Sequence, residues 1–385
     1  MHEIRRFLPL PYEEAMAPRL KRAQERLQGS ALRRSGPGAP GTGPALLRIC
    51  GLAGSIRAQG RTLVVVEDGG LSSGVQGLAG LLGDGDPGRV RFLGGLPPPG
   101  ELREALELAA HGEILLLAAG RRDAPAAALL RGALEERYGG EAERHVLGGL
   151  PGDGEEGAGL FSAAGLLALA VLGVDVTALL AGAAAMEERC GTASFENPAW
   201  RYAAVRRQLC RSGFTVELLC CWDAALCALL EWAAGRFAAA EGKGGRALFP
   251  VAVDYSRAFC TLGQYIQEGP RLFVETAVRL EGDGDEPLSR LREAAEEGTM
   301  LSHTDHGVPN LILRPGGRTA EALGGLVAFL QRVCGLSACM GDADLFACPG
   351  VEDCEARIAG QLALSGGEGG RWRAGSRERV PAGIL

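Results

Sequence analysis

Residues 63–66 read Leu-Val-Val-Val, residues 90–93 read Val-Arg-Phe-Leu and residues 114–117 read Ile-Leu-Leu-Leu, and these three runs decide the fold class. Each has the length and the aliphatic character of a short buried strand. A glycine-rich turn and a helical stretch separate the first two runs, and a helix that begins near Glu101 separates the second from the third. Another helical stretch follows at 124–138. Alternation of strand and helix is typical of parallel βαβ units.

The second half of the chain shows the same alternation. After helices at 162–186 and 198–212, the pattern predicts strands at 215–219, 248–254, 272–276 and 310–313 with helices at 224–240 and 287–298. We therefore predict an α/β fold with two lobes. The expected division is residues 1–60 for an N-terminal helical segment and linker, 61–190 for the first lobe, 191–320 for the second, and 321–385 for C-terminal helices and a loose tail.

Composition and charge exclude several function classes. Of the 385 residues 46% are hydrophobic and 23% charged, a globular composition, and the net charge of −7 provides no basic field for a nucleic acid. Eleven cysteines without a Cys-x-x-Cys pair indicate reduced thiols and a cytoplasmic protein. The apolar run 160–174 is too short to span a membrane, and the first ten residues lack the apolar core of a signal peptide.

Two polar stretches stand out. Gly263–Gly269 follows a predicted strand, and ligands in open parallel sheets bind at the carboxyl ends of strands. Glu268 within it is a candidate proton shuttle if it is partly desolvated, or else a solvated turn residue. Residues 302–310 hold His303 and His306 in a predicted loop, where a metal site has only weak support.

Taken together, three stretches resemble glucose-6-phosphate isomerases of the bacterial type: Thr-Leu-Gly-Gln-Tyr-Ile-Gln-Glu-Gly at 261–269, Phe-Val-Glu-Thr at 273–276, and Ser-His-Thr-Asp-His-Gly-Val-Pro-Asn at 302–310. Further stretches that look like the same family, in the same order, are 179–185, 196–199, 202–206, 231–232, 241–243, 249–250 and 348–352. The resemblance implies two sugar-isomerase (SIS-type) three-layer α/β/α lobes with parallel sheets, a homodimer and a small sugar phosphate as substrate. We expect no cofactor and no metal.

The family interconverts an aldose 6-phosphate and a ketose 6-phosphate. The chemistry needs ring opening, a carboxylate that moves a proton between C2 and C1 through a cis-enediolate, a cation near the developing charge, and a polar phosphate site. The resemblance implies that Glu268 is this carboxylate and that His303, supplied by the partner subunit, opens the ring. It also implies that Gln264 and Gln267 contact the substrate.

The first half departs from the family where phosphate is expected to bind. The family's Gly-Ile-Gly-Gly-Ser turn is here Glu-Asp-Gly-Gly-Leu at 67–71, which keeps Gly69 and Gly70 but adds two carboxylates. The family's Ser/Thr-rich phosphate loop corresponds to residues 117–125, which keep Gly120 and lack every hydroxyl. Arg121 and Arg122 either replace the hydroxyls as phosphate ligands or are solvated surface arginines.

Two family cations are also missing. Glu-Glu-Gly at 155–157 aligns with the family's Gly-Gly-Arg, and Glu355 stands where the family has an active-site lysine. Arg357, the nearest cation, belongs to another helix face, and Lys243 is a further candidate. His306 replaces a family glycine and is either a new contact or a passive loop residue.

Three hypotheses follow. The chain is a divergent isomerase with impaired activity, or a catalytically inactive sugar-phosphate-binding or regulatory module, or a protein for an unphosphorylated or differently charged sugar recognised by Glu67 and Asp68. A cation within reach of Glu268 would favour the first hypothesis, a divergent isomerase.

Overall fold

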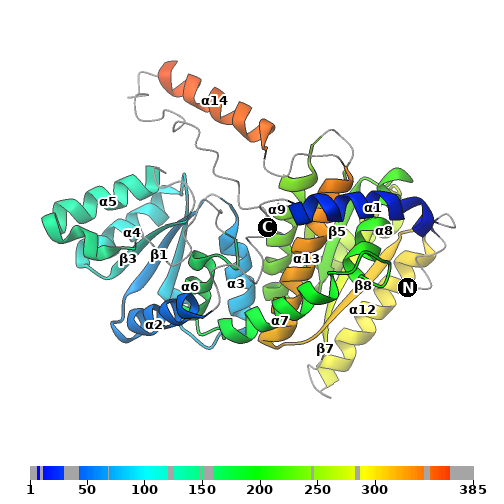
Figure 1. Cartoon of the computed structure of the whole chain (residues 1–385), viewed down its shortest axis with the longest axis horizontal. Helices are drawn as coiled ribbons and strands as arrows, with labels where there is room; N and C mark the ends of the chain where they lie inside the picture. Colours follow the sequence, from blue (N-terminus) through cyan, green and yellow to red (C-terminus); the bar gives the residue numbers. More distant parts are fainter. Residues whose placement is uncertain are drawn as a thin grey trace.

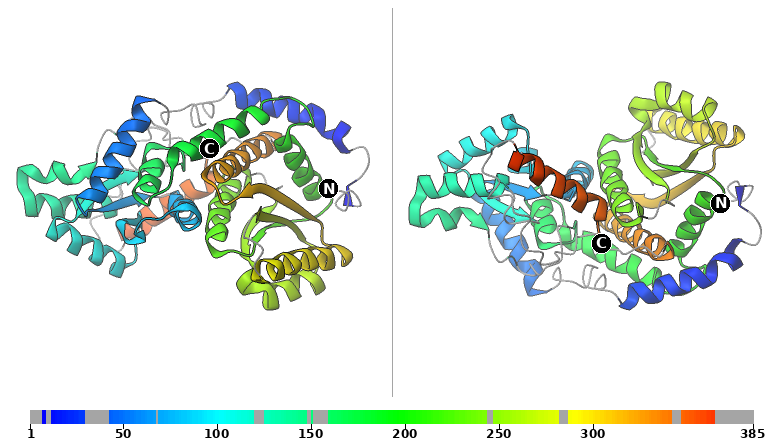
Figure 2. Two further views of the ribbon diagram at one scale, coloured as in Figure 1. Left: turned by 90° about the horizontal axis from the view of Figure 1, so that it is seen from below. Right: turned by 90° about the horizontal axis from the view of Figure 1, so that it is seen from above.

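The computed structural model describes residues 7–8, 12–29, 43–67, 69–119, 125–147, 150, 159–243, 247–281, 287–341 and 347–364. Two lobes, each with its own four-stranded parallel sheet, lie side by side (Figures 1 and 2). The predicted α/β fold with parallel sheets is therefore confirmed.

The first lobe is built on a sheet with strand order β2-β1-β3-β4. Its elements are α2 (Pro44–Ala58), β1 (Thr62–Glu67), α3 (Leu71–Leu82), β2 (Val90–Gly94), α4 (Pro99–His111), β3 (Ile114–Ala119), α5 (Pro125–Tyr138), β4 (Val146–Leu147) and α6 (Ala163–Val171), with 3₁₀ turns at Pro87–Arg89 and Gly139–His145. Alternate residues of β1 enter opposite cores: Val64 and Val66 pack with α4 and α5, whereas Leu63 and Val65 pack with α2, α3 and α6. The lobe therefore has three layers.

The second lobe repeats this plan with strand order β6-β5-β7-β8. Its elements are α7 (Val176–Arg189), α8 (Pro198–Arg211), β5 (Val216–Cys221), α9 (Ala224–Glu241), β6 (Phe249–Asp254), α10 (Tyr255–Ala258), a π-helical turn (Phe259–Gly263), α11 (Gln264–Glu268), β7 (Phe273–Glu281), α12 (Pro287–Asp305), β8 (Asn310–Gly317) and α13 (Ala320–Met340). Leu219 and Cys221 face α8, α9 and α13, and Leu218 and Cys220 face α10, α11 and α12.

Helices from the two ends of the chain lie outside these sheets. α1 (Tyr12–Gly29) packs on α8 and α13, and the Trp200 indole N–H donates to Gln24 Oε1 at 2.6 Å. α14 (Pro349–Leu364) has described side chains that are almost all exposed. By length and composition alone α13 could cross a membrane, but almost all of it is buried inside the structure, as in the core helix of a globular protein.

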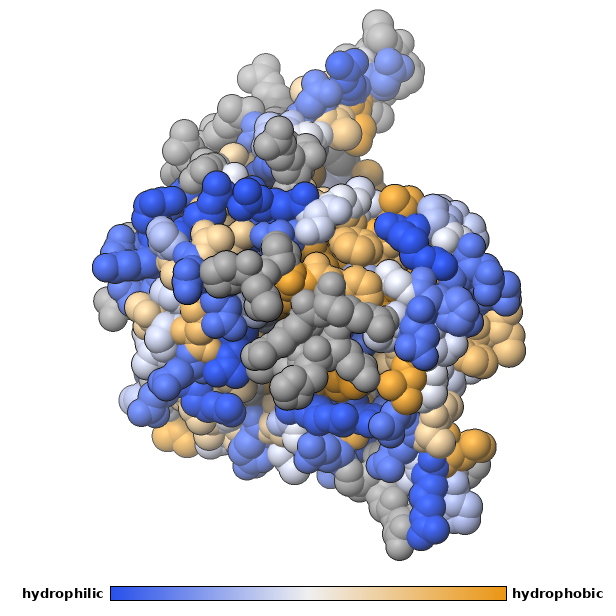
Figure 3. All heavy atoms as spheres, turned by 90° about the vertical axis from the view of Figure 1, so that its right-hand side faces the viewer, coloured by the Kyte–Doolittle hydropathy of each residue, from blue (hydrophilic) through white to orange (hydrophobic). Residues whose placement is uncertain are grey.

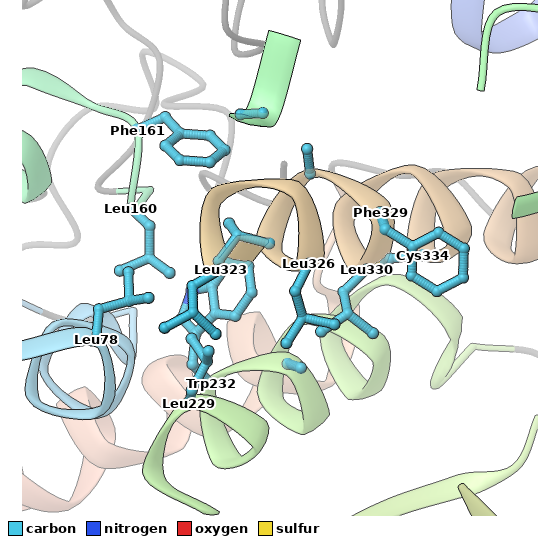
Figure 4. Packing of buried hydrophobic residues seen from close by; sticks show 14 of the residues in the cluster. Leu78, Leu160, Phe161, Leu229, Trp232, Leu323, Leu326, Phe329, Leu330 and Cys334 are labelled. Atoms are coloured by element: carbon cyan, nitrogen blue, oxygen red, sulfur yellow. The ribbon is translucent and has the colours of Figure 1, made fainter. Parts of the chain in front are cut away.

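The lobes meet where α3 packs on α9. A Cβ atom at Gly77 would lie 2.5 Å from the backbone nitrogen of Leu229, so only glycine allows the two helices to approach this closely. Figure 4 shows the buried side chains of this region: Leu78 of α3 and Trp232 of α9 lie near Leu323 of α13. The two lobes thus share one continuous hydrophobic core.

Three expectations about local structure are wrong. The helix expected at 162–186 is divided into α6 and α7, because Gly173 has φ 85° and Asp175 caps the new helix. Gly263–Gly269 is helical rather than an open turn. Residues 302–305 form the last turn of α12 rather than a loop, since the helix continues past Gly298 and ends before Gly307, which has φ 88°.

Candidate active site

The two motifs of the second lobe lie against each other. Ser302 Oγ donates a hydrogen bond to Gln267 Oε1 at 3.1 Å and so joins the last turn of α12 to α11. α11 leads into the amino end of β7, and α12 leads into the amino end of β8. The expectation that this site lies at the carboxyl ends of the strands is therefore wrong, because α10, the π-helical turn and α11 carry the chain back along the sheet after β6.

Glu268 is the last residue of α11 and its side chain is exposed. Within the described ranges its carboxylate has no hydrogen bond or ion pair. Gln264 is one helical turn earlier on the same face and is also exposed. The partial desolvation expected of a proton-transferring carboxylate is thus not provided by this chain alone.

His303 lies deeper, with 2% of its surface exposed. Its Nδ1 is 2.9 and 3.0 Å from the two carboxylate oxygens of Glu275 on β7. The Tyr255 hydroxyl also donates to Glu275, and burial, followed by the charges of Cys220 and Glu275, raises the pKa of that hydroxyl far above its usual range. Glu275 therefore fixes the orientation of the imidazole, and Tyr255 stays protonated as a donor.

His306 is exposed, and its Nδ1 is 2.8 Å from the carbonyl oxygen of Ser302. Since a carbonyl only accepts, Nδ1 carries the proton, and the 3.4 Å approach of the Gln267 amide nitrogen is a weak contact. His111 at the end of α4 bonds the carbonyl of Glu107 in the same way, so this bond by itself is ordinary helix-end geometry.

Arg271 is bonded to the backbone around Glu268. Arg271 Nη1 donates to the carbonyl oxygens of Gly269 at 2.8 Å and Ile266 at 3.4 Å, on either side of Glu268 in the sequence. A Cβ atom at Gly307 would lie 3.7 Å from Cδ and Nε of the same arginine. Sequence reasoning missed Arg271, although its position three residues after Glu268 in a tight turn was a usable signal.

In the first lobe, Glu67 closes the turn at the N-terminus of α3. Its Oε2 accepts from the backbone N–H of Gly69 at 2.8 Å and Leu71 at 3.1 Å, and its Oε1 from Ser72 at 3.4 Å. Gly70 has φ 73°, which favours glycine. The carboxylate thus occupies the amide donors that an anion would use at this helix end.

Arg236 of α9 lies against this turn. Its guanidinium is 3.4 Å from the place of a Cβ at Gly69, and burial lowers its pKa. Asp68, Gly120, Arg121, Arg122 and residues 155–157 lie outside the described residues.

Sheet β6-β5-β7-β8 stands between the two halves of the expected site. Arg236, which touches Gly69, belongs to α9 on one face of this sheet, whereas Ile266 of α11 and Met300 of α12 pack on the other. One chain therefore does not bring Gly69 and Gly70 to Glu268.

The other candidate cations also lie apart from Glu268. Lys243 follows α9 and acts electrostatically on Cys334 of α13, on the far face of the sheet. Arg357 of α14 is exposed and bonds Asp353 at 2.9 Å. Among the described residues no group of three or more His, Cys, Asp or Glu side chains is placed to hold a metal ion.

Comparison with solved structures identifies the fold. The chain superimposes on a hypothetical protein from Thermus thermophilus with a TM-score of 0.72 at 20% identity, over 91% of this chain and 96% of that one. A glucose-6-phosphate isomerase from Chlamydia trachomatis superimposes with a TM-score of 0.68 at 16% identity, over 83% and 73%. The fold is therefore the two-lobed sugar-isomerase fold.

Sequence similarity then gives the family. The chain is 32% identical to a glucose-6-phosphate isomerase from Symbiobacterium thermophilum over 83% of its own length and 86% of the relative's. It is 35% identical to that of Heliobacterium modesticaldum over 56% of this chain and 53% of the relative. No family model matches the sequence. The chain belongs to the glucose-6-phosphate isomerase family.

Proposed function

We propose that the protein interconverts glucose 6-phosphate and fructose 6-phosphate through a cis-enediolate, with impaired activity. The observation that carries this proposal is the meeting of α11 and α12. There an exposed carboxylate, Glu268, has an amide, Gln267, fixed beside it by Ser302. A carboxylate that is open to a ligand at this junction can remove the proton from C2 and return it at C1.

Ring opening is assigned to His303, which the resemblance implies is supplied by the partner subunit. Its Nδ1 is held by Glu275, an arrangement that keeps an imidazole in one orientation. Gln264 and Gln267 serve as hydroxyl contacts in this proposal.

The complete site is proposed to form between two copies of the chain. Sheet β6-β5-β7-β8 separates Gly69 and Gly70 from Glu268 within one chain, so a second copy must bring a first lobe to α11. Exposed apolar side chains surround α11: Phe259, Leu262 and Tyr265 are 45%, 48% and 56% exposed. Figure 3 shows hydrophobic residues among hydrophilic ones on the second-lobe end of the molecule. Covering this surface would also remove water from around Glu268.

Activity is expected to be low because the first lobe has lost phosphate donors. Glu67 occupies the amides of α3, and no hydroxyl remains in the 117–125 stretch. One electrostatic contact of this type is worth a factor of about 10² to 10³ in rate.

Occupation of these amides by Glu67 also favours the second candidate, a catalytically inactive sugar-phosphate-binding or regulatory protein. In either case we propose a cytoplasmic location. All eleven cysteines lie within the described ranges and none forms a disulfide, which fits a reducing compartment.

A coupled assay tests the proposal. Purified protein is given fructose 6-phosphate and glucose 6-phosphate formation is followed, for the wild type, Glu268→Gln and the control Glu136→Gln on the outer helix α5. We expect turnover in the wild type and the control and at least a hundredfold loss in Glu268→Gln. Equal rates in all three would reject Glu268 as the base, and no turnover in folded wild type would favour the inactive alternative.

A further inference from the structure

We propose that Arg271 is the cation that stabilises the enediolate at the Glu268 site. This inference rests on the proposed function and names the group that takes over from the two cations missing relative to the family. Arg271 lies within the described residues, and its guanidinium bonds the two carbonyls that flank Glu268 in the sequence.

The hydrogen bonds of Arg271 leave one edge of the guanidinium for a ligand. A guanidinium has five N–H donors, and both described bonds are made by Nη1. In the described part of the chain, Nε and Nη2 have no hydrogen-bond partner. The Nε–Nη2 edge can bind two oxygens side by side.

The shape of the intermediate matches this edge. When the Glu268 carboxylate takes the C2 proton, the C2–H electron pair forms the C1=C2 bond and the C1 carbonyl π pair moves to O1. The cis-enediolate then carries O1 and O2 on the same side. Two parallel N–H donors can bond both oxygens, and the negative charge on O1 appears only as the proton leaves. Transfer of the O2 hydroxyl proton to O1, together with protonation at C1 by Glu268, then gives a C2 carbonyl and a C1 hydroxyl.

The position of Arg271 is fixed independently of substrate. The Gly269 bond at 2.8 Å anchors the guanidinium to the turn after Glu268, and its stem lies beside Gly307 in the turn after α12. A cation held in this way needs little reorganisation during the reaction, which is the condition for effective electrostatic catalysis.

A different positive charge does not fully replace this side chain. A lysine ammonium keeps the charge but lacks the two-point fork, so Arg271→Lys should recover only part of the rate. Because the charge on O1 develops in the transition state, loss of Arg271 should lower kcat more than it raises KM.

The test compares Arg271→Ala and Arg271→Lys with Arg137→Ala. Arg137 is an exposed arginine of α5 that also bonds a backbone carbonyl, that of Ala110, and is remote from α11. We expect kcat to fall by about 10² to 10³ in Arg271→Ala, by less in Arg271→Lys, and not at all in the control. Guanidinium ion added at millimolar concentration should restore part of the lost kcat in Arg271→Ala. Unchanged kcat, or a loss that guanidinium does not rescue, would overturn the proposal.

A binding measurement separates this proposal from the proposed function. Arabinonate 5-phosphate carries a carboxylate whose two oxygens resemble those of the enediolate, and calorimetry measures its binding. If the wild type has no turnover but binds this acid at least tenfold more tightly than Arg271→Ala does, the proposed function fails and the oxyanion-binding role of Arg271 stands. Equal binding by both proteins would overturn that role.

Discussion

Ser302 on α12 donates a hydrogen bond to Gln267 on α11, and this 3.1 Å contact joins the two motifs that resemble the isomerase family. Since Gln267 precedes Glu268, the bond connects the position of the candidate base to the end of the helix that carries His303. The candidate site is therefore a junction of two helix ends at the amino edge of the second sheet.

The first prediction concerns this bond. Ser302→Ala should reduce the free energy of unfolding by about 1 kcal/mol, and a double-mutant cycle with Gln267→Ala should give a coupling of about 0.5–1.5 kcal/mol. Urea unfolding measures both. Ser55 and Gln59 form an exposed Ser–Gln pair at the C-terminal end of α2, 3.0 Å apart, and the same cycle there should give a smaller coupling and no change in kcat. Equal coupling in the two pairs would contradict a special role for Ser302.

The second prediction concerns the contact between the lobes. Gly77→Ala should destabilise the protein by more than about 2 kcal/mol, because the added methyl group meets the α9 backbone. Gly132→Ala on α5 is the matched control: among the described residues, no atom outside the backbone of α5 itself lies within 4 Å of the Cβ position. The higher helix propensity of alanine should therefore raise the free energy of unfolding by about 0.5–1 kcal/mol. Thermal unfolding of both variants checks the opposite signs.

The third prediction concerns Glu67. Glu67→Ala should lower the free energy of unfolding by about 1–2 kcal/mol, since it removes a carboxylate that accepts from several N–H groups at the start of α3. Millimolar fructose 6-phosphate should shift the Tm of the wild type little and that of Glu67→Ala more, because the variant frees these amides for an anion. A large shift in the wild type would show that Glu67 does not block phosphate.

Asp175→Ala controls for the loss of an ordinary cap. Its Oδ1 accepts from two N–H groups of α7 at 3.0 Å. The Asp175→Ala substitution should lower the free energy of unfolding by about 1 kcal/mol and leave the Tm shift with fructose 6-phosphate unchanged.

The fourth prediction is a pH dependence at Asp223. Burial alone would raise the pKa of this carboxyl group, but the backbone N–H of Leu226 and the guanidinium of Arg318 outweigh burial and lower it. An aspartate has a pKa near 3.9 when unfolded. The stabilisation is therefore complete above about pH 5 and is lost as the pH falls through the lowered value.

Asp223→Asn tests this sign. At pH 6 the free energy of unfolding of the variant should be about 1 kcal/mol lower than that of the wild type. This difference should shrink towards pH 3. Denaturant unfolding between pH 3 and 6 measures it. A constant difference over this range would show that the charge of Asp223 is not responsible.

The fold was largely predictable because short aliphatic runs alternate with helical stretches, and β1, β3 and β5 fall within about two residues of their expected bounds. The path after β6 was not predictable. Residues 255–268 form consecutive helical turns that return to the amino edge of the sheet, and their polar, glycine-bracketed sequence looks like a loop. Glu275 acts through a contact with His303, 28 positions further along the sequence, which periodicity does not reveal.

The central claim, proton transfer by Glu268, is tested most directly by following fructose 6-phosphate in D₂O by NMR. The account predicts that the wild type forms glucose 6-phosphate with deuterium incorporated at C2, and that Glu268→Gln shows neither isomerisation nor deuterium incorporation. Incorporation at the same rate in Glu268→Gln would contradict the account.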